Sequence, residues 1–115
     1  MKAELKNYRQ SPRKVRLVAN LVKGLSVNQA LVELDFLAKR AALPLQKLIK
    51  SAVANANSNN GESFIIKNIT VDKGITLKRS MPVSRGSAHP IHKHTSRVIV
   101  TLGLASETKK TSKKK

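Results

Sequence analysis

Residues 73–97 read KGITLKRSMPVSRGSAHPIHKHTSR, and this stretch is called the finger below. It contains no Asp or Glu, and it carries five lysines and arginines before Arg97 together with all three histidines of the chain. A connection this long inside a small domain indicates either a functional element or disorder. We expect a protruding β-hairpin, in which two arms of about 11 residues each would reach roughly 35 Å.

The sequence on both sides of the finger is typical of β-strands. Residues 64–71 and 97–102 are rich in β-branched side chains, and we expect them to pair as antiparallel strands. A weaker alternation over residues 2–9 indicates a short edge strand. The prolines and the glycine of residues 82–90 predict the tip of the hairpin.

Three helices are predicted before the first of these strands. Ser11 and Pro12 form a typical helix start, and Gly24 ends that helix. Ser26 and Gln29 have the spacing of a capping box for a second helix that runs to about Leu37. The third helix spans residues 41–56, with Pro44 in its first turn and with alanines 52, 54 and 56 allowing close packing. The expected apolar positions of the first two helices are Val15, Val18, Leu21, Val22, Ala30, Leu31, Leu34 and either Leu37 or Ala38.

These elements predict an α+β fold, with three helices packed on a small antiparallel sheet and a long protruding β-hairpin. A chain of 115 residues with 40% hydrophobic content suffices for one domain, here residues 1–105, in which Phe36 and Phe64 are expected in the core. Residues 57–61 are expected to form a turn, and the lysine-rich residues 106–115 a disordered basic tail. The chain has no cysteine, no long apolar run and no signal-peptide core, which favours a cytoplasmic protein.

The formal net charge of +17 points to a polyanionic partner, with RNA and DNA as the first candidates. Only Tyr8, Phe36 and Phe64 are aromatic, whereas proteins that bind single strands by stacking need several exposed rings. We therefore expect recognition mainly through phosphate, sugar and shape. Arg13, Lys14 and Arg16 could instead be the solvated face of a helix, but so few acids exist to pair with them that phosphate contact is favoured.

Other classes of function find less support. His89, His92 and His94 could suggest a metal site, but the finger offers no Cys, Asp or Glu to complete one, so no metal or other cofactor is expected. The six acidic residues are scattered and none is adjacent to a histidine, which argues against an enzyme. A cationic helix on a membrane surface is disfavoured because residues 41–46 are nearly uncharged and read as core. A DNA-compacting architectural protein, usually dimeric, would share the charge and remains the rival.

Four segments together resemble the L-twenty-two family of bacterial large-subunit ribosomal proteins. They are residues 11–19 (SPRKVRLVA), residues 51–56 (SAVANA), residues 78–82 (KRSMP) followed by Arg85 and Gly86, and Thr95 with Ser96 before the last strand. The resemblance extends from about Tyr8 to Leu102. It implies a small domain seated on large-subunit rRNA and a hairpin that lines the nascent-peptide exit tunnel near its narrow part and near the region where macrolides bind. It also implies early subunit assembly, neighbouring ribosomal proteins as partners, and a monomer within the ribosome; the missing transit peptide favours a bacterial origin.

The resemblance also assigns residues. It implies that rRNA is contacted by Arg9, Ser11, Arg13, Lys14, Arg16, Lys73, Lys78, Arg79, Arg85, His92, Lys93, His94 and Arg97. It implies that the tip facing the tunnel and the nascent polypeptide comprises Met81, Pro82, Val83, Ser84, Arg85, Gly86, Ser87, Ala88, His89 and Pro90. The chain departs from the family pattern at Val83 and Ser84, where a basic residue is common, and in the histidines that accompany Pro90.

Overall fold

The computed structural model describes residues 1–56 and 63–105, so the predicted turn at 57–61 and the predicted basic tail at 106–115 lie outside the described residues. The elements, in chain order, are β1 (Lys2–Tyr8), α1 (Pro12–Val22), α2 (Val27–Phe36), α3 (Ala42–Asn55), β2 (Phe64–Lys73), β3 (Leu77–Pro82), a short 3-10 turn η1 (Ser84–Gly86), β4 (Ala88–Lys93) and β5 (Ser96–Leu104). The three predicted helices and the predicted edge strand are thus confirmed.

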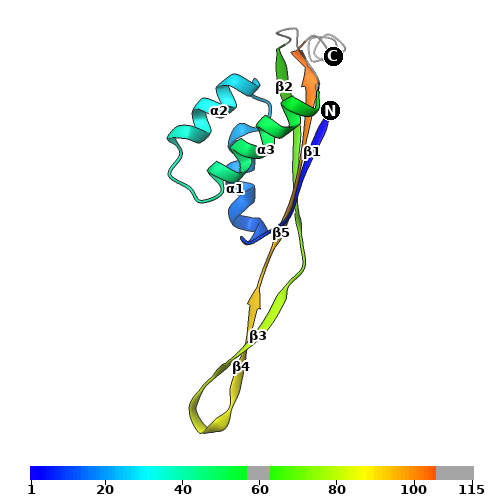
Figure 1. The fold of residues 1–115 in the computed structure, drawn as a ribbon. Helices are drawn as coiled ribbons and strands as arrows, with labels where there is room; N and C mark the ends of the chain where they lie inside the picture. The colour runs from blue at the N-terminus through cyan, green and yellow to red at the C-terminus, as the bar shows by residue number, and fades with distance from the viewer. Residues whose placement is uncertain (57–62, 106–115) are drawn as a thin grey trace, which may run out of the picture.

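The domain consists of a layer of helices on one face of a three-stranded antiparallel sheet (Figure 1). The strand order is β1-β5-β2, so the last strand of the described chain lies at the centre. Helix α1 lies against β2, α3 lies against β1 and β5, and α2 packs on α3. Val98 and Val100 of β5 are fully buried beneath Leu45 and Ile49 of α3, which confirms the predicted α+β class.

The ends of the first two helices follow the predicted signals in most respects. Helix α1 begins at Pro12, and Gly24 lies just beyond its end with φ +85°, a left-handed conformation that glycine adopts without strain. The Ser26 hydroxyl oxygen accepts a hydrogen bond from the Gln29 N–H at 3.4 Å, as expected for a helix cap. The predicted return bond is different, because the Gln29 side chain accepts from the Ser26 hydroxyl rather than capping its backbone N–H.

Helix α3 buries one apolar face, formed by Ala42, Leu45, Leu48, Ile49 and Ala52. Pro44 lies in its first turn, where its missing N–H leaves no intrahelical bond broken. Ala52 is fully buried against the sheet, but Ala54 is exposed, because two helical steps turn a side chain by about 200°. The close approach of helix and sheet therefore depends on Ala52 rather than on all three predicted alanines.

Two predicted core residues are in fact exposed. Leu21 of α1 is 59% exposed, because the helix turns Ala19 rather than Leu21 toward the sheet. Phe36 of α2 is 85% exposed, because the buried face of that helix is formed by Val27, Ala30 and Leu34, and position 36 lies opposite to it. Phe64, by contrast, is 5% exposed and belongs to the core, as predicted.

The finger projects from the end of the sheet as a separate two-stranded ribbon (Figure 1). The molecule measures 65 × 33 × 24 Å, and its radius of gyration of 18.0 Å exceeds the value of about 13 Å typical of a compact chain of this length. None of residues 74–94 belongs to the core. The strand ladder continues to the pair of Pro82 with Ala88, and Pro90 lies within β4, so the turn at the tip is shorter than the predicted 82–90.

Candidate nucleic-acid interface

Hydrogen bonds close the base of the finger between its two arms and join it to the domain. The Gly74 N–H donates to the Thr95 carbonyl oxygen at 2.9 Å, and the Thr95 hydroxyl donates to the carbonyl oxygen of Ile75. The Ser96 hydroxyl donates to the carbonyl oxygen of Gln10 in the loop that follows β1. Both hydroxyl-bearing residues are buried, so these bonds are shielded from water and define the direction in which the finger leaves the sheet.

Arg16 joins this base from helix α1. Its Nε and Nη2 both donate to the carbonyl oxygen of Val71, at 3.1 and 2.9 Å. Two donors of Arg16, which the sequence predicts as a phosphate contact, therefore also stabilise the fold. We call this region, where α1, β1, β2 and β5 meet the finger, the shoulder.

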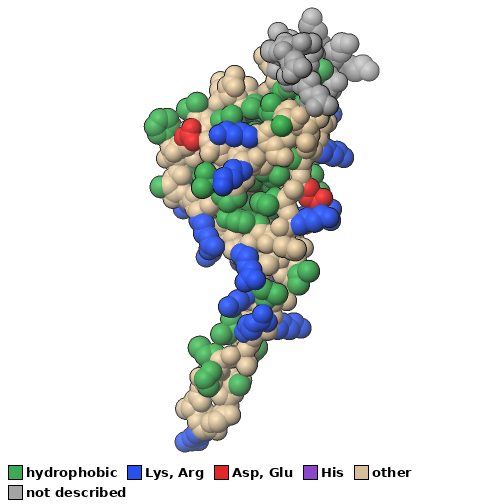
Figure 2. Space-filling model, in the orientation of Figure 1, with side chains coloured by type: hydrophobic (Ala, Val, Ile, Leu, Met, Phe, Trp, Pro, Cys, Tyr) green, Lys and Arg blue, Asp and Glu red, His purple; other side chains and the backbone are tan. Residues whose placement is uncertain are grey.

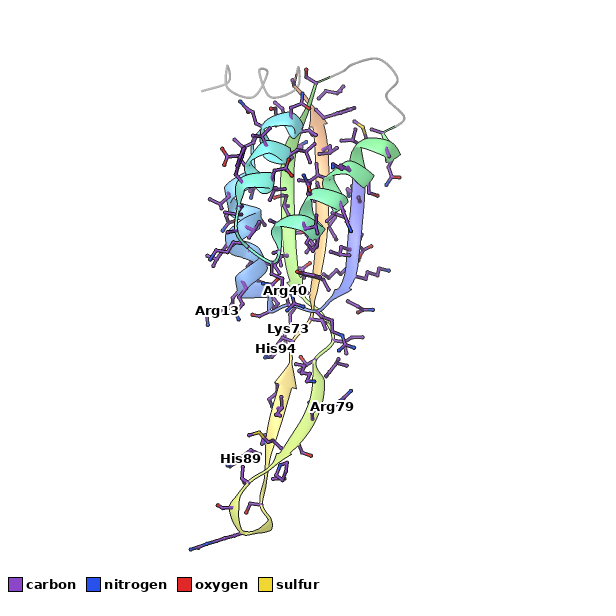
Figure 3. All side chains as sticks on the ribbon, turned by 60° about the vertical axis from the view of Figure 1, so that its left-hand side comes forward. Arg13, Arg40, Lys73, Arg79, His89 and His94 are labelled. Atoms are coloured by element: carbon purple, nitrogen blue, oxygen red, sulfur yellow. The ribbon has the colours of Figure 1, made fainter. Side chains whose placement is uncertain are left out.

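The shoulder contains an open hollow of about 450 Å³, lined by Ser11, Pro12, Arg13, Arg16, Lys73 and His94. It brings together residues from the start of α1 and from both arms of the finger base, and Figure 3 shows Arg13, Lys73 and His94 around this junction. Three of these side chains are always charged at neutral pH, and the N-terminus of α1 adds its partial positive charge. Such a hollow suits an oxyanion, of which a backbone phosphate is the most abundant kind in nucleic acids.

A second hollow of about 380 Å³ lies on the face of the sheet that the helices leave uncovered, and it is lined by Lys6, Asn7, Lys73, Gly74, Ile75 and Arg97. Lys73 therefore borders both hollows. Glu4 accepts from Nε of Arg97 and lies 4.0 Å from Nζ of Lys6. Because this carboxylate compensates part of the charge of Arg97, the second hollow is less cationic than the first.

The cations of the finger lie on both of its faces. Residues directly opposite each other in an antiparallel ribbon share a face. The strand register therefore places Arg79, Lys93 and His89 on one face with Leu77, Ile91 and Met81, and Lys78 and His92 on the other with Ser80 and Pro90. The rings of His92 and His94 stack with their centres 6.4 Å apart, so these two histidines project to the same side, as their alternate spacing predicts. A ribbon of this kind can contact phosphates on two sides at once.

The tip carries a cation on strained backbone. Arg85 has φ 60°, and Gly86 follows with φ 70°. A left-handed conformation costs a residue with a Cβ roughly 1–2 kcal/mol. The Val83 N–H closes the turn by donating to the Ser87 carbonyl oxygen at 2.9 Å. Figure 2 shows a basic side chain at the far end of the molecule.

Sequence reasoning missed Arg40 and Lys6 as members of the shoulder. The Arg40 carbonyl oxygen lies 3.5 Å from the Tyr8 hydroxyl, and Tyr8 pairs with Ser96 at the finger base (Figure 3). The only sequence signal for Arg40 was the basic pair that it forms with Lys39 in the loop before α3. Loops have no periodicity from which the face of a side chain could be predicted.

The electrostatic balance of the described residues is one-sided. Within residues 1–56 and 63–105, the only ion pairs are those of Glu4 with Lys6 and Arg97. In the same ranges no three His, Cys, Asp or Glu side chains come together in a group that could hold a metal ion. No described helix is both long enough and apolar enough to cross a membrane. The predicted contacts Arg9, Arg13, Lys14, Lys73, Lys78, Arg79, Arg85 and Lys93 are all exposed and free to meet an external anion.

Comparison with known proteins identifies relatives over nearly the whole chain. Residues 3–103 match the family described as Ribosomal protein L22p/L17e. The Large ribosomal subunit protein uL22 of Flavobacterium psychrophilum is 44% identical over 112 residues, which cover 92% of this chain and 82% of that relative. The proteins of the same name from Herpetosiphon aurantiacus and Mycoplasma capricolum are 47% and 45% identical, and the aligned parts cover 86% and 88% of this chain and 90% and 94% of the two relatives.

Proposed function

Because the chain belongs to the Ribosomal protein L22p/L17e family, we propose that its shoulder and finger bind rRNA within the large ribosomal subunit. The protein is a structural component of that subunit and not an enzyme. Its place of action is the ribosome in the cytoplasm, and its partners are rRNA and other ribosomal proteins.

The observation that carries the proposed interface is the gathering of cations around the first hollow, whose lining contains no carboxylate. Arg13, Lys73 and His94 surround one hollow, and Lys73 also borders the second. Phosphates of a folded RNA would replace the missing counter-charges, and the release of their own counterions would drive binding. The buried hydrogen bonds of Thr95 and Ser96 would hold the finger in a fixed direction, so that the RNA meets a surface that is already formed.

The finger is proposed to line the nascent-peptide exit tunnel, and the domain to take part in early subunit assembly as a monomer. Three features support this role. The finger adds nothing to the core and extends the molecule to 65 Å. It is free of carboxylates, so it can pass between crowded phosphates. Its turn at residues 83–87, which carries Ser84, Arg85 and Ser87, lies at the end of the hairpin farthest from the helices (Figure 1).

The test of the interface is the salt dependence of binding to large-subunit rRNA. Affinity is expected to fall steeply with salt, by roughly 0.7–0.9 log units per log unit of salt for each phosphate contacted. Lys73→Ala should make that slope shallower by the amount expected for about one phosphate contact, because Lys73 borders both hollows. Lys67→Ala is the matched control, since it removes an equal charge from an exposed position near the opposite end of β2.

Two results would contradict the proposed interface. Binding that hardly responds to salt would exclude phosphate neutralisation as its basis. Equal effects of the Lys73 and Lys67 substitutions would show that net charge alone matters and that the shoulder has no special role. A preference for duplex DNA over large-subunit rRNA, with no sedimentation alongside large subunits, would favour the architectural alternative.

A further inference from the structure

Helix α2 presents an outward ridge that differs chemically from the rest of the molecule. Val32 and Phe36 are one helical turn apart, 55% and 85% exposed, and lie opposite the buried residues of α2. Glu33 and Asp35 flank them on the two sides of the helix. We call Val32, Glu33, Asp35 and Phe36 the α2 ridge. Figure 2 shows an acidic side chain on this side of the domain, with hydrophobic side chains and a Lys or Arg side chain near it.

The α2 ridge is acidic in a chain that is otherwise strongly basic. Helix α2 contains no Lys or Arg, yet it carries two of the six acidic residues of the whole sequence. No described cation forms an ion pair with Glu33 or Asp35, because the ion pairs of residues 1–56 and 63–105 all involve Glu4. Asp35 accepts a hydrogen bond from the Gln46 amide of α3, which holds this carboxylate in place at the edge of the ridge.

This combination does not suit RNA. The two carboxylates would repel phosphates, and an apolar ridge offers no donor to them. Phe36 is the most exposed of the large hydrophobic side chains in the described part of the chain. Burying it against a partner would therefore contribute favourable hydrophobic free energy. Aromatic side chains are instead enriched in protein interfaces, where they act as anchors.

Resting on the proposed function, we propose that the α2 ridge docks a basic segment of a neighbouring large-subunit protein. An apolar side chain of that segment packs on Phe36 and Val32, and its Lys or Arg side chains pair with Glu33 and Asp35. The protein would then have two binding surfaces: the shoulder and finger bind RNA, and the α2 ridge binds a neighbouring protein. Charge complementarity identifies the partner as basic, since the unpaired charges of the ridge are all negative.

The first experiment replaces Phe36 with the photo-crosslinking amino acid p-benzoylphenylalanine in the full chain, in cells that carry no other copy. Large subunits are purified, irradiated and analysed by mass spectrometry. The expected product is a crosslink to a protein segment rich in Lys and Arg. The control is the same substitution at Leu21, which is 59% exposed on α1, where such a protein crosslink is not expected. Should the Phe36 variant enter subunits poorly, the same measurement is made at Val32, one turn earlier.

Three outcomes would overturn the inference: a crosslink to rRNA, a crosslink to a segment without basic residues, or no crosslink in subunits that contain the variant. The proposed function is tested separately, because it falls if the unmodified chain is absent from large subunits. If the chain is present and position 36 reacts with RNA, only the role of the ridge is wrong.

The second experiment removes the charges of the ridge without changing its shape. Glu33→Gln with Asp35→Asn keeps an acceptor oxygen for Gln46, and it is combined with the crosslinker at position 36. The crosslink yield per incorporated chain is expected to fall at least threefold. A control that adds the same charge elsewhere, Asn20→Lys with Thr70→Lys, should leave the yield unchanged. An unchanged yield in the ridge variant, or an equal fall in the control, would refute charge pairing.

Discussion

Gly74 lies at the point where the finger leaves β2, and Gly74→Ala tests how tightly that junction is packed. A Cβ at this position would lie 2.5 Å from the Thr95 hydroxyl oxygen, and 3.3 and 3.4 Å from the carbonyl carbon and oxygen of Thr95. Thr95 is 4% exposed, and its hydroxyl is engaged with the carbonyl oxygen of Ile75, so it cannot turn away freely. The new methyl group must therefore displace either that hydrogen bond or the backbone.

The expected cost follows from two opposing effects. Overpacking a tight site costs about 1–3 kcal/mol, whereas replacing Gly by Ala lowers the entropy of the unfolded chain and stabilises by about 0.4–1 kcal/mol. The clash outweighs the entropy gain, and Gly74→Ala should lower the free energy of unfolding by about 1–2 kcal/mol. In a Thr95→Ala background the hydroxyl is gone, so the same substitution should be neutral or stabilising by up to about 1 kcal/mol.

The assay is urea unfolding followed by far-ultraviolet circular dichroism, since the chain has no tryptophan to serve as a fluorescent probe. Ile75→Ala is the control; this neighbouring side chain is 65% exposed, and the change should alter stability by no more than about 0.5 kcal/mol. If Gly74→Ala is as stable as the unaltered chain, or equally destabilising with and without the Thr95 hydroxyl, the proposed contact does not limit the junction.

Three further perturbations separate the roles of core, shoulder and finger. Replacing residues 74–94 by a short turn should leave the domain folded, because none of these residues is in the core. The free energy of unfolding should fall by about 1–3 kcal/mol, because the buried Thr95 hydroxyl loses the carbonyl oxygen of Ile75, and loss of the folded circular dichroism spectrum would show that the finger belongs to the core. Arg16→Lys keeps the charge but loses the paired donors to the Val71 carbonyl oxygen, so the free energy of unfolding should fall by about 1 kcal/mol while the salt slope of RNA binding stays the same. A changed slope with unchanged stability would show that Arg16 contacts RNA rather than supporting the fold. Phe36→Ala should change the free energy of unfolding by at most about 0.5 kcal/mol, whereas Phe64→Ala should lower it by about 3–5 kcal/mol. Similar losses for the two variants would contradict the exposed position of Phe36 and the buried position of Phe64.

Much of the fold could be predicted because its signals are local. Pro12, Gly24 and Ser26 mark helix ends through backbone constraints that act within one turn. The two β-branched segments around the finger are the β2 and β5 strands, and their antiparallel pairing follows from the hairpin between them. The carboxylate-free finger was equally visible, since charge is a property of composition rather than of geometry.

Side-chain roles that depend on distant neighbours were less accessible. Phe36 was expected in the core because aromatic residues in apolar stretches usually are, but the orientation of α2 on α3 turns it outward. Arg16 is predicted to contact RNA, and its additional hydrogen bonds to Val71, which bridge 55 positions of sequence, could not be foreseen from the sequence. Thr95 and Ser96 were noticed as a motif, but only their bonds to Ile75 and Gln10 explain why hydroxyl side chains are needed there.

The sequence by itself determined the class of the fold, the existence of a cationic hairpin and the need for a polyanionic partner, because periodicity, turn chemistry and net charge are properties of neighbouring residues or of the whole chain. Only the tertiary structure decided which cations share a hollow at the shoulder, what holds the finger in its direction, and that Val32 and Phe36 of the α2 ridge are exposed. These features depend on contacts between segments far apart in the chain, and such contacts are defined only once the helices have packed on the sheet.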